Sequence, residues 1–346
     1  MISIEIKPYI LNKKHVFRIA GGSRTNTPVL LIKLKYDRFV GYGEASMPPL
    51  YGESIASAQR FIKTFDFSPF SSPLEIEAIL KSLDQHAAGN PAIKAAVDIA
   101  LHDLIGKMKN IPLYEYFNLP RKELKTSKTI GIDSAEIIRQ RVDEAADYHY
   151  LKIKLGGDND AEIIKAVRSV SHKPLFIDAN QGWINKEEAL DKIAWLKDEG
   201  AVFIEQPMPK KAFNDMEWLV ARSPLPLIGD EGIQRLEEVK TASNFYHGIN
   251  IKLMKSTGLH EAFAMANLAK SMNLKIMIGC MSETSCAIAA AAHLGAMADW
   301  VDLDGNLGVT NDPFQGHQVI NGSIHLNDTN GIGLINPDWN KIETYV

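Results

Sequence analysis

Residues 150–304 contain a short apolar run about every 25 positions: YLKIK (150–154), PLFID (174–178), AVFIE (201–205), PLIGD (226–230), GINIK (248–252), KIMIG (275–279) and DWVDLD (299–304). Each run suits one strand, and the amphipathic segment that follows it suits one helix. With a further strand near 125–131, the repeat predicts eight parallel strands and a (β/α)8-type barrel. A doubly wound open sheet is the alternative, but its usual Gly-rich phosphate turn is absent from the sequence.

The first third of the chain has a different pattern. Residues 2–10, 29–35 and 39–45 read as three strands joined by short turns, which favours an antiparallel meander. Apolar residues at helical spacing between 93 and 105, after the start signal Asn-Pro, predict a helix. We expect two domains. The first is an α+β capping domain of residues 1–120 together with the C-terminal tail 315–346, and the second is a barrel of residues 121–314.

The composition narrows the class of protein. Of 346 residues, 45% are apolar and 23% are charged, which excludes a disordered or fibrous chain. With a net charge of −4, the chain lacks the excess of basic residues that is typical of proteins that bind nucleic acids or membranes through basic segments. Two cysteines and an N-terminus without a signal-peptide core fit a reducing compartment. We therefore expect a cytoplasmic protein with no nucleic-acid or membrane partner, and the sequence leaves a homo-oligomer open.

Charged residues end six of the seven runs. In a parallel barrel the C-terminal ends of all strands meet at one rim, where the active sites of this fold lie. A single charge at a strand end is usually just solvated, but so many at one rim indicate a site. The residues expected there are Lys152, Lys154, Asp178, Glu205, Asp230, Lys252, Asp302 and Asp304.

Three carboxylates come from adjacent strands: Asp178, Glu205 and Asp230. Packed together without a cation they would repel one another and take up protons. An all-oxygen set with no His or Cys cluster beside it suits a hard cation, of which Mg²⁺ fits best and Mn²⁺ is a replacement. The alternative is a set of carboxylates neutralised by the neighbouring lysines alone.

The lysines flank this set. Lys152 and Lys154 point to one face of their strand, and Lys252 lies on the far side of the three acidic strands. A carboxylate substrate between them would offer both faces of its α-carbon to two bases. That suits removal of a proton beside a carboxylate, where a divalent ion stabilises the developing charge. Lys255 is the rival of Lys252, but its strand parity would place it outside the mouth.

Several motifs carry a resemblance to a known family: GYGEA (41–45), PAIKAAVDIALHDLIGK (91–107), LKIKLG (151–156), FIDANQGW (176–183), FIEQP (203–207), LIGDEGI (227–233), INIKLMKSTG (249–258) and MIGCMSET (277–284). The chain resembles the enolase superfamily in its muconate-lactonising subgroup. Within that subgroup it is similar to the dipeptide epimerases, such as those that act on L-Ala-D/L-Glu.

The resemblance implies an α/β fold, a modified (β/α)7β TIM-type barrel with an α+β capping domain. It implies an isomerase, a Mg²⁺-dependent dipeptide epimerase that moves a proton at the α-carbon of the C-terminal residue, with a role in recycling cell-wall peptides. The substrate would be L-Ala-D/L-Glu or a related Ala-Xaa or hydrophobic dipeptide. The resemblance implies that Lys154 and Lys252 are the acid/base catalysts and that Lys152 is their electrostatic partner. It also implies that Asp178, Glu205 and Asp230 are the Mg²⁺ ligands, and that Asn180 and Glu231 lie behind these ligands.

The substrate-binding residues follow from the rim and from two loops. Asp302 and Asp304 share one face of the last strand and suit the α-ammonium group of a peptide. Segments 21–27 and 46–54 read as mobile loops that close over the mouth. In these loops Arg24 would bind a side-chain carboxylate and Tyr51 would shape an apolar pocket. Cys280 follows the seventh strand near the rim and would line the site.

Other functions are open at this point. Within the superfamily they are an N-succinylamino acid racemase, an o-succinylbenzoate synthase and a muconate-type cycloisomerase, against which the paired aspartates argue. A Schiff-base aldolase would also use lysines at strand ends, but three carboxylates do not serve its chemistry. A non-catalytic binding protein descended from such an enzyme would be expected to have lost a ligand or a base.

Overall fold

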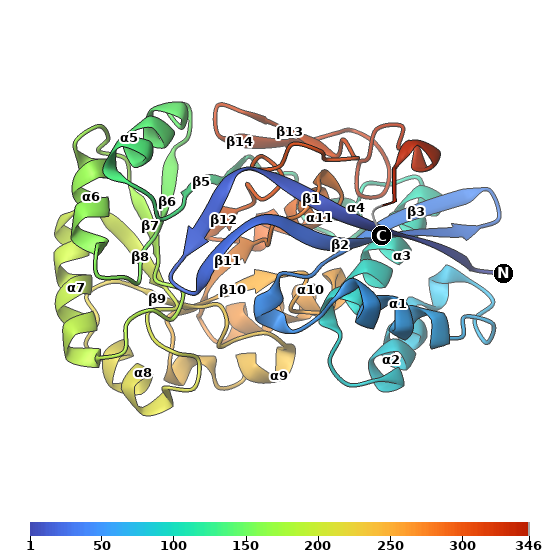
Figure 1. Ribbon diagram of the computed structural model, residues 1–346. Helices are drawn as coiled ribbons and strands as arrows, with labels where there is room; N and C mark the ends of the chain where they lie inside the picture. The colour runs from blue at the N-terminus through green and yellow to red at the C-terminus, as the bar shows by residue number, and fades with distance from the viewer. Residues whose placement is uncertain (345–346) are drawn as a thin grey trace.

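The computed structural model describes residues 1–344, and its central feature is a sheet of eight parallel strands (Figure 1). The strands follow one another in sequence order around the sheet: β5 (Ser127–Ile130), β6 (Tyr150–Lys154), β7 (Leu175–Asp178), β8 (Ala201–Glu205), β9 (Leu227–Gly229), β10 (Gly248–Lys252), β11 (Lys275–Gly279) and β12 (Trp300–Asp302). A parallel bridge from Thr126 to Val301 brings the two edges together. The predicted barrel of eight parallel strands is confirmed.

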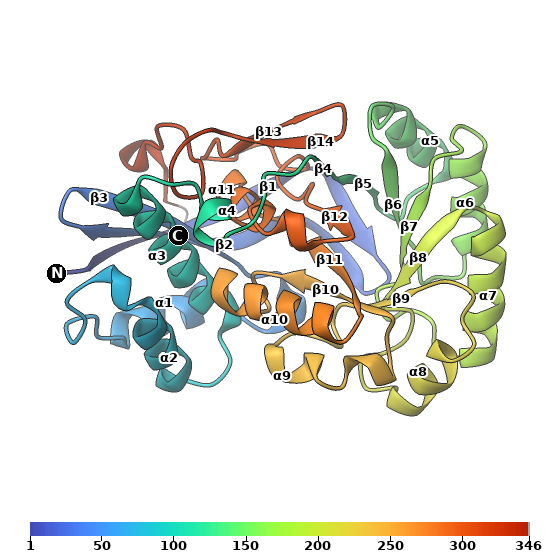
Figure 2. The ribbon, with the colours of Figure 1, turned by 180° about the vertical axis from the view of Figure 1, so that it is seen from behind.

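Helices cover the outside of the barrel (Figures 1 and 2). Between the first and last barrel strands the α-helices are α5 (Ala135–Glu144), α6 (Asp160–Arg168), α7 (Lys186–Asp198), α8 (Phe213–Val220), α9 (Leu236–Val239), α10 (Leu259–Ser271) and α11 (Ser285–Ala292). One α-helix follows each strand from β5 to β11, and within residues 1–344 no α-helix follows β12. The barrel is therefore of the (β/α)7β kind, as the family resemblance implies.

The interior of the barrel is apolar below the rim. Phe176, Phe203, Ile228 and Met277 form a fully buried cluster, in which the Phe176 and Phe203 rings are 4.5 Å apart. Because side chains on a strand alternate between its faces, the residue two positions later also points inward. Each of the first three cluster residues is followed at that spacing by an acidic residue. The carboxylates thus stand directly above a dry layer.

The N-terminal part of the chain builds the cap. Strands β1 (Ser3–Ile19), β2 (Gly22–Tyr36) and β3 (Phe39–Ser46) form an antiparallel meander. The helices that follow are α1 (Ile55–Thr64), α2 (Ile76–His86), α3 (Pro91–Lys109) and the one-turn α4 (Leu113–Tyr116). A Cβ on Gly41 or Gly43 would lie within 2.0 Å of a backbone oxygen of α3, so only glycine lets this helix pack on β3. The predicted meander and helix are confirmed.

The prediction for segment 21–27 is wrong, because residues 22–27 are paired in β2. The β1–β2 hairpin is much longer than the sequence pattern indicates, and it reaches from the cap across the barrel (Figure 1). It is fastened there through its backbone. The Lys14 amide donates to the Gly308 carbonyl at 2.9 Å, and the Ile132 amide donates to the Arg18 carbonyl at 3.0 Å. The hairpin therefore forms one wall of the barrel mouth.

A third, small sheet lies at the edge of the barrel. Strands β13 (His317–Ile320) and β14 (Ser323–Leu326) form an antiparallel pair, and β14 also pairs with β4 (Leu124–Lys125). The C-terminal segment therefore packs beside the start of the barrel. None of the helices within residues 1–344 is both long and apolar enough to cross a membrane.

Candidate active site

A cavity of about 480 Å³ opens between the barrel rim and the β1–β2 hairpin. It collects most of the side chains that the sequence places at a site. Those in its wall are Arg24, Tyr51, Lys152, Lys154, Asn180, Asp230, Glu231, Lys252, Cys280, Asp302 and Asp304. Asp178 and Glu205 are fully buried behind the cavity wall. Glu205 contacts Lys152 and Asp178 contacts Lys154, and both lysines line the cavity.

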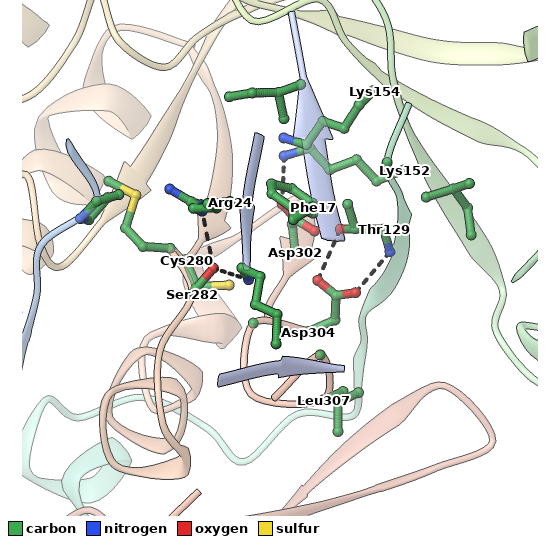
Figure 3. A pocket seen from close by; sticks show the side chains of 18 of the residues that line it. Phe17, Arg24, Thr129, Lys152, Lys154, Cys280, Ser282, Asp302, Asp304 and Leu307 are labelled. Atoms are coloured by element: carbon green, nitrogen blue, oxygen red, sulfur yellow. Dashed lines mark hydrogen bonds and ion pairs between the residues drawn. The ribbon is translucent and has the colours of Figure 1, made fainter. Parts of the chain in front are cut away.

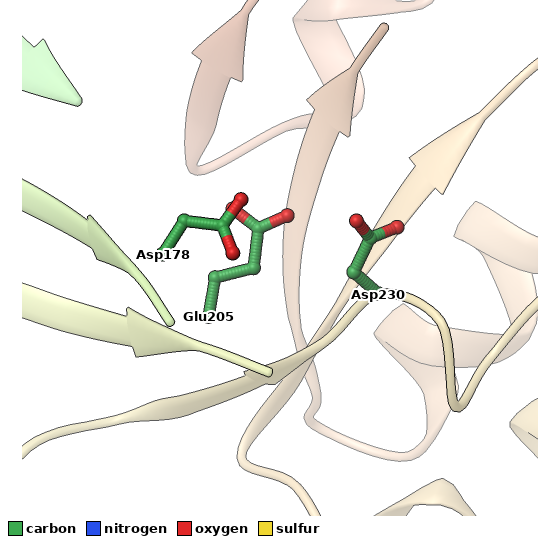
Figure 4. A group of neighbouring side chains, drawn as sticks. All are labelled: Asp178, Glu205 and Asp230. Atoms are coloured by element: carbon green, nitrogen blue, oxygen red, sulfur yellow. The ribbon is translucent and has the colours of Figure 1, made fainter. Parts of the chain in front are cut away.

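The three predicted metal ligands lie together. One carboxylate oxygen from each of Asp178, Glu205 and Asp230 lies within 4.8 Å of the others, and all three residues are buried (Figure 4). They come from the ends of β7 and β8 and from the residue after β9. Asn250 donates its amide N–H to Glu205 Oε1 at 2.7 Å. Sequence reasoning missed Asn250, although its place two residues before Lys252 puts it on the same inward face.

Lys152 is the central cation of the site. Its Nζ lies 2.6 Å from Glu205 Oε2, 2.6 Å from Asp302 Oδ2 and 3.4 Å from Asp178 Oδ2. Burial alone would lower the pKa of Lys152, but the carboxylates outweigh burial and raise it well above its ordinary value. The surrounding carboxylates therefore favour the charged form of Lys152.

The two predicted catalytic lysines each hold one carboxylate. Lys154 Nζ lies 2.6 Å from Asp178 Oδ2, and Lys252 Nζ lies 2.6 Å from Asp230 Oδ2. Lys154 ends β6 and Lys252 ends β10, so the three acidic strands separate them. Burial would lower the pKa of Lys252, but Asp230 outweighs it and raises that pKa.

Lys255 supports Asp230 from outside the cavity wall. Its Nζ donates to Asp230 Oδ1 and to the Asp230 carbonyl at 2.6 Å, and to the carbonyls of Ile233 and Asn250 at 3.0 Å. All of its protons are engaged, so it is not free to react with a substrate. The strand-parity argument for excluding it does not apply, because β10 already ends at Lys252.

Burial and repulsion act on the acidic residues of the site. Burial and then Asp178 raise the pKa of Glu205 to about 7, and burial and then Asp230 raise the pKa of Glu231 to about 7. Burial also opposes ionisation of Asp178, but Lys154 and Lys152 outweigh it and lower its pKa. Burial and the neighbouring carboxylates thus favour uptake of positive charge at Glu205 and Glu231, whereas the lysines favour the ionised form of Asp178.

The side chains present fit a hard divalent cation. The donor set is made of carboxylate oxygens close enough to share one ion, which is the chemistry that Mg²⁺ prefers. Beside the set, the buried Asn180 Oδ1 and Glu231 Oε2 make no hydrogen bond within residues 1–344. Buried oxygen atoms are rarely left unpaired, so these two are available to an ion or to its bound water.

The two aspartates at the last strand have different surroundings (Figure 3). Asp302 ends β12, pairs with Lys152 and accepts a hydrogen bond from Ser127 Oγ at 2.7 Å. Asp304 lies beyond the strand and accepts hydrogen bonds from the Thr129 amide at 2.8 Å and from its hydroxyl at 3.0 Å. Both side chains line the cavity, so they present an acidic edge there.

The hairpin supplies the opposite wall. Arg24 on β2 lies over the ring of Phe17 on β1, with 5.4 Å from its guanidinium carbon to the ring centre (Figure 3). Its Nη2 donates to Ser282 Oγ at 3.4 Å. Tyr51, in the 3-10 turn η1 (Pro49–Tyr51), and Cys280, after β11, complete this wall. Burial raises the pKa of the Cys280 thiol well above its ordinary value, which disfavours the thiolate form.

Comparison with known families assigns both parts of the chain. Residues 3–117 match the N-terminal domain of the mandelate racemase / muconate lactonizing enzyme family. Residues 133–339 match the enolase C-terminal domain-like family. The two matches together cover most of the cap and of the barrel.

Individual relatives are similar over nearly their whole length. The L-Ala-D/L-Glu epimerase of Bacteroides thetaiotaomicron is 47% identical over 330 residues, which are 95% of this chain and 86% of that protein. Among solved structures, a substrate-liganded complex of the L-Ala-D/L-Glu epimerase from Bacillus subtilis superposes with a TM-score of 0.92 at 28% identity, covering 97% of this chain and 98% of that one. The dipeptide epimerase of Enterococcus faecalis, complexed with Mg and L-Leu-L-Tyr, gives 0.90 at 29% identity, covering 96% and 98%.

Proposed function

The chain belongs to the mandelate racemase / muconate lactonizing enzyme family of the enolase superfamily, and from this we propose that it is a Mg²⁺-dependent dipeptide epimerase. One observation carries the proposal. Three buried carboxylates within 4.8 Å of one another lie between two lysines that project from strands on either side of them. Two bases flanking a cation site are what inversion at a carbon beside a carboxylate requires.

In this mechanism the lysines handle the proton. One of Lys154 and Lys252 removes the α-proton of the dipeptide's C-terminal residue, and the other returns a proton to the opposite face. Lys152, as a fixed cation, holds the substrate carboxylate in place. Mg²⁺ held by the triad Asp178, Glu205 and Asp230 would supply positive charge beside that carboxylate while the α-proton leaves.

The substrate is proposed to be a peptide with a free ammonium group. Asp302 and Asp304 form the acidic edge of the cavity at and just beyond the end of β12, where Asp302 contacts Lys152, and they would bind the α-ammonium group. The alternative substrates of the superfamily, N-succinylamino acids and muconates, lack this group. This is why we propose epimerisation of dipeptides over those reactions.

The side chain of the epimerised residue would face the hairpin. Arg24 there makes no ion pair within residues 1–344 and offers its guanidinium to an acidic side chain. The relative at 47% identity is named for L-Ala-D/L-Glu. We propose L-Ala-D/L-Glu as the substrate, with other Ala-Xaa dipeptides as weaker ones, and recycling of cell-wall peptides as the setting.

Proton NMR in D₂O with Mg²⁺ tests the proposal on a panel of L-Ala-L-Glu, L-Ala-L-Gln, L-Ala-L-Leu and N-succinyl amino acids. We expect the α-proton signal of the C-terminal residue to disappear and the second diastereomer to appear. Both effects should stop with EDTA and return with added Mg²⁺. Exchange with N-succinyl amino acids alone would replace the peptide by an acylamino acid, and no exchange with any compound would refute the proposal.

A further inference from the structure

Two cations of the hairpin wall converge on one hydroxyl group. Lys13 Nζ lies 2.5 Å from Ser282 Oγ, and Arg24 Nη2 lies 3.4 Å from the same oxygen. Both cations also lie over the ring of Phe17, at 4.9 Å for Lys13 and 5.4 Å for Arg24. All four residues line the cavity.

This pair differs from every lysine at the rim. Lys152, Lys154 and Lys252 each have a carboxylate oxygen at 2.6 Å. Within residues 1–344, neither Lys13 nor Arg24 has a carboxylate within ion-pair distance. Two like charges held side by side without an acid are unfavourable, and a hydroxyl with an aromatic ring offsets only part of that cost. An anionic group brought by the substrate would complete the arrangement.

The position of Lys13 is set by the backbone. Asn12 pairs with Asn26 and Phe17 pairs with Arg24, so residues 13–16 stand opposite a single residue of β2 as a bulge. The bulge is fastened by a bridge from Lys13 to Val309. The Lys13 ammonium is thus presented to the cavity by a fixed strand, which reduces the entropy lost on binding.

Ser282 is fixed in the same way. Its carbonyl accepts a hydrogen bond from Ser46 Oγ at 2.7 Å, and the amide of the next residue but one, Thr284, donates to the Glu44 carboxylate at 2.9 Å. Both partners belong to β3 of the cap. The hydroxyl of Ser282 can therefore turn towards a ligand while its backbone stays in place.

We propose that Lys13 is a second specificity-determining residue, which binds the side-chain carboxylate of the epimerised residue together with Arg24 and Ser282. This inference rests on the proposed function and deepens it. Lys13 takes one carboxylate oxygen and Arg24 the other, while the Ser282 hydroxyl donates to the ligand instead of only accepting from the two cations. The subsite then selects acidic over neutral side chains of the same shape.

Steady-state kinetics with L-Ala-L-Glu and its neutral isostere L-Ala-L-Gln test this role. The variant Lys13→Met keeps the length of the side chain and removes the charge. We expect its KM for L-Ala-L-Glu to rise about tenfold or more with kcat within about threefold, because one charge-assisted hydrogen bond to the ground state is lost. Its constants for L-Ala-L-Gln should stay within about twofold, and Lys13→Arg should recover most of the discrimination.

The matched control is Lys35→Met, since Lys35 is exposed on β2 of the same hairpin and does not line the cavity. It should behave as the unmodified protein with both peptides. An equal loss with L-Ala-L-Glu and L-Ala-L-Gln in Lys13→Met would reduce Lys13 to a structural partner of Ser282 and overturn the inference. If the unmodified protein turns over no dipeptide, the proposed function fails instead, so the two failures are distinct.

A pH profile gives a second readout. Burial and then Arg24 lower the pKa of Lys13 to about 8, with Lys128 acting in the same direction and Asp304 and Cys280 opposing. In the free protein Lys13 is thus a cation below about pH 8 and neutral above it. We expect the ratio of kcat/KM for L-Ala-L-Glu over L-Ala-L-Gln to fall above pH 8, because ionisations common to both peptides cancel. A ratio that stays flat to pH 10, or that falls equally in Lys13→Arg, would contradict the inference.

Discussion

The barrel rim and the hairpin wall face each other across one cavity, and they treat charge in opposite ways. At the rim Lys152, Lys154 and Lys252 each lie 2.6 Å from a carboxylate oxygen, and all three project from barrel strands. On the wall the two cations share a hydroxyl and have no acidic partner within residues 1–344. The difference indicates a division of labour. The charges of the rim lysines are neutralised by carboxylates of the protein before the substrate binds, and the rim performs the reaction. The charges of the wall are neutralised only by an acidic group of the substrate, so the wall selects the substrate.

The largest effect should come from the rim lysines, where removal of either base breaks the reaction itself. In Lys154→Met and Lys252→Met we expect epimerisation to fall about 10³-fold or more, as is typical for loss of a general acid or base. Each variant keeps one base, so it should still exchange the α-proton of one diastereomer with D₂O. The two variants should choose opposite diastereomers, which proton NMR can show directly.

Calorimetric Mg²⁺ titration of both lysine variants provides the control for correct folding, because the three carboxylates remain. Loss of exchange from both diastereomers in a variant that still binds Mg²⁺ would argue against two bases on opposite faces. Equal exchange of both diastereomers in either variant would argue that the remaining lysine, or water, reaches both faces.

An intermediate effect should come from the wall, where a change should alter selection without altering the reaction. In Arg24→Met we expect KM for L-Ala-L-Glu to rise about 10- to 100-fold, because a guanidinium–carboxylate contact is charge-assisted. The kcat should change little, and L-Ala-L-Leu should be used at least as well as before. Steady-state kinetics with both peptides measure this, and a matching loss with L-Ala-L-Leu would place Arg24 in the reaction and remove the distinction between rim and wall.

The smallest effect should come from the contact that holds the wall in place. Ser46→Ala removes the hydrogen bond to the Ser282 carbonyl, and we expect a loss of about 1 kcal/mol in the free energy of unfolding and a severalfold rise in KM for L-Ala-L-Glu only. Ser57→Ala is the matched control, since it removes the hydrogen bonds of the Ser57 hydroxyl to the Ser54 backbone at the start of α1, away from the cavity. Chemical denaturation and kinetics on both variants separate the two effects. A change in KM that is equal for the two variants would show that stability, rather than the wall, is being measured.

The rim could be predicted from the sequence because its geometry is local and periodic. The strands recur about every 25 residues, and the inward face follows from alternation within each strand, so Asp178, Glu205 and Asp230 could be brought together without coordinates. Asn250 was within reach of the same argument, as it lies two residues before Lys252 on one strand. What alternation cannot supply is the partner of each charge, such as the Asp230 carboxylate that raises the pKa of Lys252.

The wall could be predicted only in part. Arg24 and Tyr51 were expected near the mouth, but segment 22–27 reads as a loop because its small polar residues carry no strand periodicity. It is a strand because β1 pairs with it on both sides of the bulge at residues 13–16, and that pairing is not visible in the composition. Lys13 was missed for the same reason, since its position depends on a bulge in which residues 13–16 stand opposite a single residue of β2, and no short-range pattern records that bulge.

The fastening of the hairpin also has a consequence for the order in which the molecule assembles. The Asn12 amide is hydrogen-bonded to Asn311, and Lys7 Nζ to the Ile342 carbonyl, so the two ends of the chain meet across separations of 299 and 335 residues. Contacts between such distant residues close the largest loops and form slowly. A nascent chain could therefore build the barrel strands and their acidic rim before the wall has its anchor. During folding, the chain should therefore be able to bind the metal before it is able to bind the peptide.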